Sequence, residues 1–284
     1  MPYVSVGKEN SGDIEIYYED HGSGDPVVLI HGWPFSRRAW EKQIPALVGE
    51  GYRVISYDRR GFGRSSQPAF GYDYDTFADD LNRLMESLDL KGATLMGHSM
   101  GSGEVARYLG KYGSSRVSQA VAIATLGPFL LKTRDNPGGL EQAVFDGIEN
   151  SFATDRLASL TSFIKNFFNT DVTLGRLVSE EVIRAHWNIA SMASPIGTLA
   201  CIKAWGTDFR KDLAKIDVPL LIIHGDADRI LPYEKTAPLE QQAVKGSRLV
   251  TIKNGSHGIF WTHAEELNRE ILRFLKTAGE RKAA

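Results

Sequence analysis

The sequence places one serine where it could act as a nucleophile. Ser99 lies in Gly97-His-Ser-Met-Gly101, between an apolar stretch typical of a strand and a stretch typical of a helix, which is the context that a G-x-S-x-G nucleophile turn requires. The bare motif arises by chance in roughly one chain in ten of this length, so the flanking elements carry the prediction. Glycine lets the strand and the helix approach closely, and the helix N-terminus supplies N–H groups that stabilise negative charge. We therefore predict Ser99 to be the nucleophile of a hydrolase.

A serine hydroxyl needs a neighbouring base to take its proton, and the chain has seven histidines. We predict His257 to be this base, because its turn, Asn254-Gly-Ser-His-Gly258, follows the last predicted strand and can return to the edge of the sheet that carries Ser99. His224 ends an earlier predicted strand and is expected to pack beneath the site. The other five are interpreted as structural, with His98 a neighbour of the nucleophile: His21, His31, His98, His186 and His263.

The acid that orients the base should follow a strand between the serine and the histidine in chain order. Gly225-Asp-Ala-Asp-Arg-Ile-Leu-Pro232 has this position, and Asp226 and Asp228 both fit its spacing. Two alternating carboxylates point in different directions, and the first is expected to form the turn, so Asp228 is favoured. Its expected role is to hold the imidazole in one tautomer and to stabilise the imidazolium, without taking up the proton itself.

Backbone N–H groups that could hold an oxyanion are expected in two turns. His31-Gly-Trp-Pro34 directly follows the apolar run Val27–Ile30 and occupies the loop that donates the second N–H in sites of this kind. We predict Trp33 and Met100 to be the two donors. A structural role, in which His31 and Gly32 turn the chain, is compatible with this one.

Alternating strand and helix patterns around these residues predict an α/β fold with a mostly parallel sheet flanked by helices. Val27–Ile30 is an uninterrupted apolar run, typical of a strand covered on both faces. The predicted strands are Tyr3–Val6 and Asp13–Glu19, which form a hairpin, then Val27–Ile30, Tyr52–Tyr57, Ala93–Met96, Val117–Ala124, Leu220–Ile223 and Arg248–Ile252. The predicted helices between and after them are Trp40–Gly49, Tyr74–Leu88, Met100–Tyr112 and Ala264–Lys276.

The strand pattern stops between Gly127 and Lys215, where helical stretches replace it. We expect a helical cap, residues 128–215, inserted between two parts of one α/β core, residues 1–127 and 216–284. Most of its many aromatic residues are expected to pack against one another, and some to line an apolar pocket. The other residues expected in that pocket are Trp33, Met100, Leu126, Phe129 and Ile230.

Composition and charge exclude other classes of protein. Apolar residues make up 42% of the 284 residues, and 33 basic residues balance 35 acidic ones, which is typical of a globular protein and gives no basic stripe for nucleic acid. The single cysteine, Cys201, excludes an intramolecular disulfide and is interpreted as a small core residue. We find neither a leader sequence nor an apolar run of membrane-spanning length. We therefore expect a cytoplasmic protein with no nucleic-acid or membrane partner, and a homo-oligomer is compatible with the sequence.

Together these motifs resemble the bacterial α/β-hydrolase family of cofactor-free haloperoxidases, or perhydrolases, which is close to aryl esterases and γ-lactamases. The resemblance spans nearly the whole chain and implies Ser99, Asp228 and His257 as the triad, which decides between the two aspartates. It also implies hydrolysis of small esters through an acyl-enzyme, with hydrogen peroxide able to replace water, and no metal, haem or other cofactor. The residues that carry it are His31-Gly-Trp-Pro34, Tyr57-Asp-Arg-Arg-Gly-Phe-Gly-Arg-Ser65, Gly97-His-Ser-Met-Gly101, Asp135-Asn-Pro137, Gly225-Asp-Ala-Asp228 and Gly255-Ser-His-Gly-Ile-Phe-Trp-Thr-His263.

Pro34 is expected to belong to the pocket as well. Because proline restricts the residue before it, it would fix the direction of the Trp33 carbonyl, which could accept a hydrogen bond from peroxide. The expected substrate is a small uncharged ester, with an amide or γ-lactam as the alternative. Dehalogenases and epoxide hydrolases of this fold use an aspartate nucleophile, so a serine at position 99 disfavours both. A noncatalytic receptor that binds a small ligand is the alternative from another class.

Overall fold

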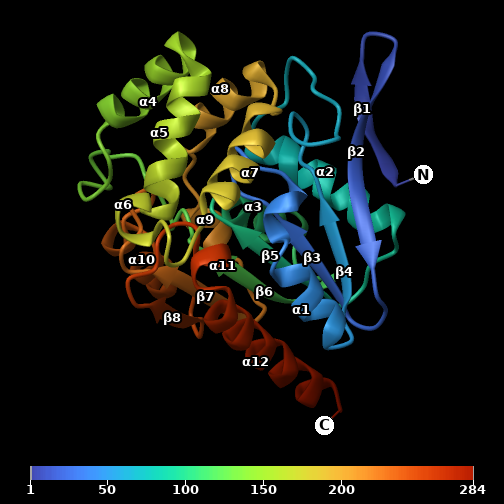
Figure 1. The fold of residues 1–284 in the computed structure, drawn as a ribbon. Coiled ribbons are helices and arrows are strands. Elements are labelled where there is room, and N and C mark those ends of the chain that lie inside the picture. The colour runs from blue at the N-terminus through green and yellow to red at the C-terminus, as the bar shows by residue number, and fades with distance from the viewer. Residues whose placement is uncertain (1, 284) are drawn as a thin grey trace.

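The computed structural model describes residues 2–283, with side chains described for residues 2–276. An eight-stranded sheet, in the order β1-β2-β4-β3-β5-β6-β7-β8, runs through the molecule with helices on both of its faces (Figure 1). The strands are β1 (Tyr3–Glu9), β2 (Gly12–His21), β3 (Pro26–Ile30), β4 (Arg53–Tyr57), β5 (Ala93–His98), β6 (Val117–Ile123), β7 (Leu220–Gly225) and β8 (Arg248–Ile252).

The N-terminal hairpin continues into the main sheet. β1 pairs with β2, and the second half of β2 pairs antiparallel with β4, with Tyr18 opposite Tyr57. From β4 to β8 all neighbouring strands are parallel. β5 and β7 are buried throughout, as expected for apolar strands covered on both faces.

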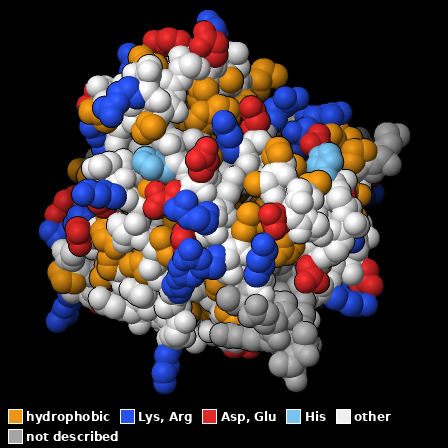
Figure 2. All heavy atoms as spheres, turned by 60° about the horizontal axis from the view of Figure 1, so that its bottom comes forward, with side chains coloured by type: hydrophobic (Ala, Val, Ile, Leu, Met, Phe, Trp, Pro, Cys, Tyr) orange, Lys and Arg blue, Asp and Glu red, His pale blue; other side chains and the backbone are white. Residues whose placement is uncertain are grey.

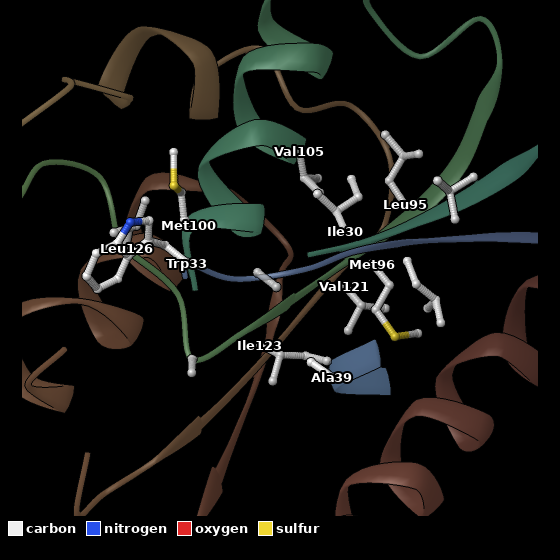
Figure 3. Packing of buried hydrophobic residues seen from close by; sticks show 14 of the residues in the cluster. Ile30, Trp33, Ala39, Leu95, Met96, Met100, Val105, Val121, Ile123 and Leu126 are labelled. Atoms are coloured by element: carbon white, nitrogen blue, oxygen red, sulfur yellow. The ribbon is translucent and has the colours of Figure 1, made fainter. Parts of the chain in front are cut away.

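Two layers of helices cover the sheet. α1 (Gln43–Gly49) packs beside α12 (Ala264–Ala283) on one face, and α2 (Tyr74–Ser87) packs beside α3 (Met100–Tyr112) on the other. The helix predicted from Trp40 starts later, at Gln43, because Arg37–Trp40 forms a separate 3₁₀ turn that is capped by Ser36. Figure 3 shows Leu95 and Val105 packed on the α3 side of the sheet, and Met96 and Val121 on the opposite side.

The segment between β6 and β7 is helical. β6 ends at Ile123 because Ala124 adopts a left-handed backbone, φ 46°, which a strand cannot include. Side chains of this segment face Leu126 and Ile230 across a cavity. Its helices are α4 (Gln142–Thr154), α5 (Arg156–Phe168), α6 (Thr170–Thr173), α7 (Glu180–Ser191), α8 (Pro195–Ala204) and α9 (Arg210–Leu213); two short helices, η2 (Tyr233–Lys235) and α10 (Ala237–Ala243), precede β8, and α11 (Ile259–Thr262) precedes α12.

The direction in which strands are added reverses at β3. β4 lies on one side of β3 and β5 lies on the other, and such a reversal opens a crevice at the carboxyl ends of parallel strands. Gly32 and Trp33 follow β3, and Ser99 follows β5. Ser99 and the predicted oxyanion donors, Trp33 and Met100, therefore flank this crevice.

The surface carries charges of both signs. Figure 2 shows Lys and Arg side chains interspersed with Asp and Glu on one face of the molecule. Of the helices in the described part of the chain, none combines the length and the apolar character needed to cross a membrane.

Candidate active site

Ser99 occupies a tight turn between β5 and α3. Its backbone has φ 54° and ψ −122°, in a region that non-glycine residues rarely adopt, and its N–H donates to the Ile123 carbonyl at 2.8 Å. The flanking glycines make room for the turn: a Cβ on Gly97 would overlap the carbonyl of Gly101, and a Cβ on Gly101 would overlap the carbonyl of Ile30. A side chain at either position would therefore push α3 away from the sheet.

Ser99, His257 and Asp228 form a buried, hydrogen-bonded row. The Ser99 hydroxyl oxygen lies 2.8 Å from Nε2 of His257, and Nδ1 of His257 lies 2.6 Å from Oδ2 of Asp228. Because an ionised carboxylate can only accept, Nδ1 carries the proton and Nε2 presents a lone pair to the serine. In this arrangement an imidazole can take the proton of a serine hydroxyl.

Asp228 is held as an anion by its surroundings. Its Oδ1 accepts the N–H groups of Ile230 and Leu231, each at 2.8 Å. Burial by itself would raise the pKa of this carboxyl, but its interactions with His257 and His224 outweigh burial and hold the pKa well below its usual range. Asp228 is therefore ionised at neutral pH.

The two aspartates that fitted the spacing have different partners. Asp226 joins the loop after β7 to the loop after β8, since its Oδ1 accepts the Asn254 N–H at 2.6 Å, whereas Asp228 contacts His257. His224 was expected only to pack beneath the site, yet its Nε2 lies 3.1 Å from Oδ2 of Asp228 and 3.0 Å from the Leu231 carbonyl oxygen. It is thus a direct neighbour of the acid, because the turn after β7 folds back over the strand end.

Trp33 and Met100 each present a backbone N–H near the nucleophile. Met100 begins α3, so its N–H has no partner inside the helix. Trp33 follows Gly32, which lies against the nucleophile: a Cβ there would be 3.0 Å from the Cβ of Ser99 and 2.6 Å from Nδ1 of His98. Within residues 2–283 neither N–H donates a hydrogen bond. The two groups could therefore hold an oxyanion formed at Ser99.

A buried network that sequence reasoning missed supports the Gly32–Trp33 loop. His31 Nδ1 lies 2.9 Å from the Gly32 carbonyl oxygen, and the Arg59 N–H donates to His31 Nε2 at 3.0 Å. The buried Arg59 guanidinium donates to the His31 carbonyl at 3.0 Å and to Glu104 at 2.7 Å. Burial and the Arg59 charge lower the pKa of His31 well below its ordinary value. His31 is therefore neutral and donates through Nδ1. The signal in the sequence that could have revealed this network was Arg59, a charged residue close to the end of the buried strand β4.

The remaining histidines take other positions. The His98 ring packs 5.0 Å from the ring of His257, so it is a neighbour of the base as well as of the nucleophile in the chain. His186 Nδ1 lies 2.8 Å from the Val182 carbonyl within α7. His21 and His263 contact Glu19 and Thr262, respectively.

A cavity of about 500 Å³ reaches Ser99, and its walls are mainly apolar. Of the residues predicted for the pocket, Trp33, Leu126 and Ile230 border it, whereas Met100, Pro34 and Phe129 do not. Pro34 is buried and follows Trp33 through a cis peptide bond. The Phe129 ring instead lies 5.0 Å from the Arg210 guanidinium. The helical segment contributes Leu140, Val144, Phe145, Ile148, Phe152, Phe163 and Trp205.

The Trp33 side chain connects the core to the helical segment. Its ring packs against the rings of Phe152, Phe163 and Trp205, with centroids 4.8 to 5.0 Å apart. Its Nε1 donates to the Thr198 carbonyl at 3.1 Å. The loop that offers one candidate oxyanion donor is thus fixed by α4, α5 and α8.

Cys201 does not take part in this site. It is fully buried on α8, and burial raises the pKa of its thiol to about 12, so the reactive thiolate is absent at neutral pH. Among the described residues, no group of three or more His, Cys, Asp and Glu side chains is arranged to hold a metal ion.

Comparisons with known proteins agree with this fold. A family model described as "alpha/beta hydrolase fold" matches residues 25–264. A protein of Synechocystis named "Putative non-heme chloroperoxidase" is 59% identical over 97% of this chain and 100% of its own, and a "Bifunctional esterase/perhydrolase" of Acinetobacter calcoaceticus is 37% identical over 98% and 100%. The crystal structure of a bromoperoxidase from Bacillus anthracis is 51% identical, with a TM-score of 0.93 over 96% of this chain and 99% of that one. The α/β fold and the resemblance inferred from the sequence are confirmed.

Proposed function

The chain belongs to the α/β-hydrolase fold family, and from this premise we propose that it is a serine hydrolase of small uncharged esters that also forms peracids from hydrogen peroxide. The observation that carries the proposal is the buried row of Ser99, His257 and Asp228 at the wall of an apolar cavity. Relatives named as a non-heme chloroperoxidase and as an esterase/perhydrolase support it.

Acylation begins with the proton of the Ser99 hydroxyl. His257 Nε2 takes this proton while Oγ attacks the carbonyl carbon of the ester, and the imidazolium that forms is stabilised by Asp228. The N–H groups of Trp33 and Met100 hold the negative charge that develops on the carbonyl oxygen. When the tetrahedral intermediate collapses, His257 returns the proton to the leaving alcohol and an acyl-Ser99 ester remains.

Deacylation repeats these steps with a second nucleophile. Water loses a proton to His257 as it attacks the acyl-Ser99 carbonyl, and collapse returns the proton to Ser99 and releases the carboxylic acid. Hydrogen peroxide in place of water gives the peracid by the same transfers, with no net oxidation or reduction at the protein. A peracid oxidises halide ions in solution, which would account for haloperoxidase activity without a redox centre.

The cavity determines which substrates fit. Its lining is mostly Leu, Ile, Val, Phe and Trp side chains, which favours uncharged acyl groups.

We assign the cap to residues 128–215 and the two parts of the core to 1–127 and 216–284, since α4 and α5 supply much of the cavity wall. Exchange of residues in these helices should therefore change substrate preference more than the chemistry. A homo-oligomer and a cytoplasmic location stay predictions.

The proposal is tested with phenyl acetate and the purified chain, with and without hydrogen peroxide. We expect phenol release in both conditions, peracid only with peroxide, and loss of both in Ser99→Ala. Ser256→Ala serves as the matched control, because Ser256 is also a buried serine near His257 but its hydroxyl contacts Thr262 at 3.4 Å. A folded wild type that binds the ester without turnover would contradict the proposal and favour a receptor.

A further inference from the structure

A line of hydrogen-bonded groups leads from α10 to the nucleophile turn. The Glu240 carboxyl contacts the Thr125 hydroxyl through Oε2, the Thr125 and Ser102 hydroxyl oxygens are 3.1 Å apart, and Ser102 Oγ lies 2.7 Å from the backbone carbonyl oxygen of Ser99. All of these side chains are buried. Neither the triad nor the oxyanion donors include them.

The neighbours of the Ser102 hydroxyl determine the direction of its hydrogen bond. Its oxygen has three neighbours: the Ser99 carbonyl, which can only accept, the Leu126 N–H at 3.2 Å, which can only donate, and the Thr125 hydroxyl. Ser102 therefore donates to the Ser99 carbonyl and accepts from Leu126. Its remaining contact is satisfied only when Thr125 donates to it.

The donors and acceptors around the Thr125 hydroxyl likewise determine the protonation state of Glu240. Thr125 accepts the Gly127 N–H at 3.1 Å, and its only proton is used on Ser102. The short contact to Glu240 is then a hydrogen bond only if the carboxyl carries a proton and donates it. If Glu240 were ionised, the Thr125 hydroxyl would donate its hydrogen bond to the carboxylate. No proton would then lie between the Ser102 and Thr125 oxygens.

The surroundings of Glu240 also favour the neutral acid. Complete burial raises the pKa of Glu240 to about 7. Hydrogen bonds from the Thr125 hydroxyl and the Gly127 N–H, and the charge of His224 on β7, act in the opposite direction, but burial outweighs them.

Charged groups on the other elements packed against α10 are exposed or have partners of their own. On η2, Lys235 donates to the Gly138 carbonyl, Tyr233 contacts Thr251, and Glu234 is exposed. On α9 and β8, Lys211 is exposed, and the ion pairs are Arg210 with Asp208 and Asp135, Asp212 with Arg107, and Arg248 with Glu270.

We propose that Glu240 is a positioning residue, held as a neutral carboxylic acid, that starts a directed hydrogen-bond chain through Thr125 and Ser102 to the backbone carbonyl of Ser99. The chain ends on the Ser99 carbonyl, which also accepts the Ser102 N–H at 2.8 Å, and so fixes the strained nucleophile turn. Through Ser102 it also fixes Leu126 in the cavity wall. Loss of the Glu240 proton would turn the Thr125 hydroxyl away from Ser102 and loosen the turn.

The protonation state is tested by unfolding, independently of activity. Between its ordinary pKa of 4.5 and about 7, Glu240 keeps a proton in the folded state that the unfolded chain has lost, so stability falls as pH rises through this window. Glu240→Gln, which cannot ionise, should gain Tm relative to the wild type by several degrees between pH 5 and pH 8. Glu234→Gln, on an exposed neighbouring position, should show no such trend. An unchanged Tm difference for Glu240→Gln would overturn the proposal.

The positioning role is tested by the pH dependence of ester hydrolysis. This test rests on the proposed function. We expect the ratio of kcat/KM for Glu240→Gln to that of the wild type to rise roughly three- to tenfold from pH 6 to pH 8.5, the factor that one hydrogen bond of this kind carries. Thr125→Val should be slow at both pH values, and Thr125→Ser should restore activity. A constant ratio would overturn the role. A chain without esterase activity would leave the unfolding result unaffected, so the two failures are distinguishable.

Discussion

The ring of His98 donates through Nε2 to the backbone carbonyl of His257, with 3.0 Å between the two atoms. A carbonyl can only accept, so Nε2 carries the proton, and burial lowers the pKa of His98 to about 3, which keeps the ring neutral. The residue before the nucleophile thereby fixes the backbone of the proposed base.

Removal of this donor should displace His257. We expect His98→Leu to lower kcat/KM for phenyl acetate by roughly tenfold and the free energy of unfolding by about 1–3 kcal/mol, because the His257 carbonyl is left buried without a partner. His98→Gln can still donate and should lose less of both. Equal losses in the two variants, measured by steady-state kinetics and urea unfolding, would argue that ring packing matters and the hydrogen bond does not.

Replacement of the acid tests the orientation of the base. Asp228→Asn should lower kcat by roughly 10⁴-fold, because an amide N–H facing Nδ1 favours the wrong tautomer of His257. Since the folded-state pKa of Asp228 is depressed, its ionisation contributes stability above its ordinary pKa of 3.8, and this contribution is lost as pH falls through the lowered folded value. The stability difference between wild type and variant should therefore shrink below about pH 4. Acid titrations of Tm for both proteins measure it, and a difference that grows toward low pH would contradict the assignment.

Gly32→Ala tests the contact between the two crevice loops. The new methyl group would lie 2.6 Å from Nδ1 of His98, so the Trp33 N–H must move. We expect a loss in kcat of roughly 10²- to 10³-fold, the typical cost of one oxyanion donor. Gly49→Ala is the control, because its methyl group meets no atom within 4 Å. Similar kinetics for the two variants would exclude Trp33 as a donor.

Val144→Trp tests the use of the cavity by the acyl chain. Val144 lines the cavity and is 44% exposed, so a larger side chain can fill space there without moving the core. We expect kcat/KM for an aryl octanoate to fall more than for the acetate, since each buried CH₂ contributes about 0.8 kcal/mol. Val172→Trp, at a 53% exposed position outside the lining, should leave the octanoate-to-acetate ratio unchanged. A ratio unaffected by Val144→Trp would place the acyl chain elsewhere.

Much of the fold could be predicted because the buried strands are apolar runs. β5 and β7 are read directly from Ala93–Met96 and Leu220–Ile223, and the residues after them define the positions of Ser99 and Asp228. The pairing of β2 with β4 could not be predicted, because it joins segments more than 30 residues apart and no local pattern specifies it.

Side-chain direction limited the prediction of the site. Phe129 has the residue type of a pocket wall, but its ring packs against the Arg210 guanidinium, whereas the next residue, Leu130, lines the cavity. Glu104 and Glu240 lie on helices, where a carboxylate usually faces water. Their burial depends on partners from other parts of the chain, Arg59 and Thr125. The contact of His224 with Asp228 likewise depends on how the turn after β7 closes.

The insertion of the helical segment between β6 and β7 has a consequence for synthesis. These neighbouring strands are separated by residues 124–219, so the sheet closes late, after the entropy of a long loop has been overcome. A nascent chain that has emerged as far as β6 contains Ser99 in its turn but neither Asp228 nor His257. Ser99 therefore leaves the ribosome well before the residues that would make it reactive, and hydrolytic capacity arises only after His257 has been synthesised.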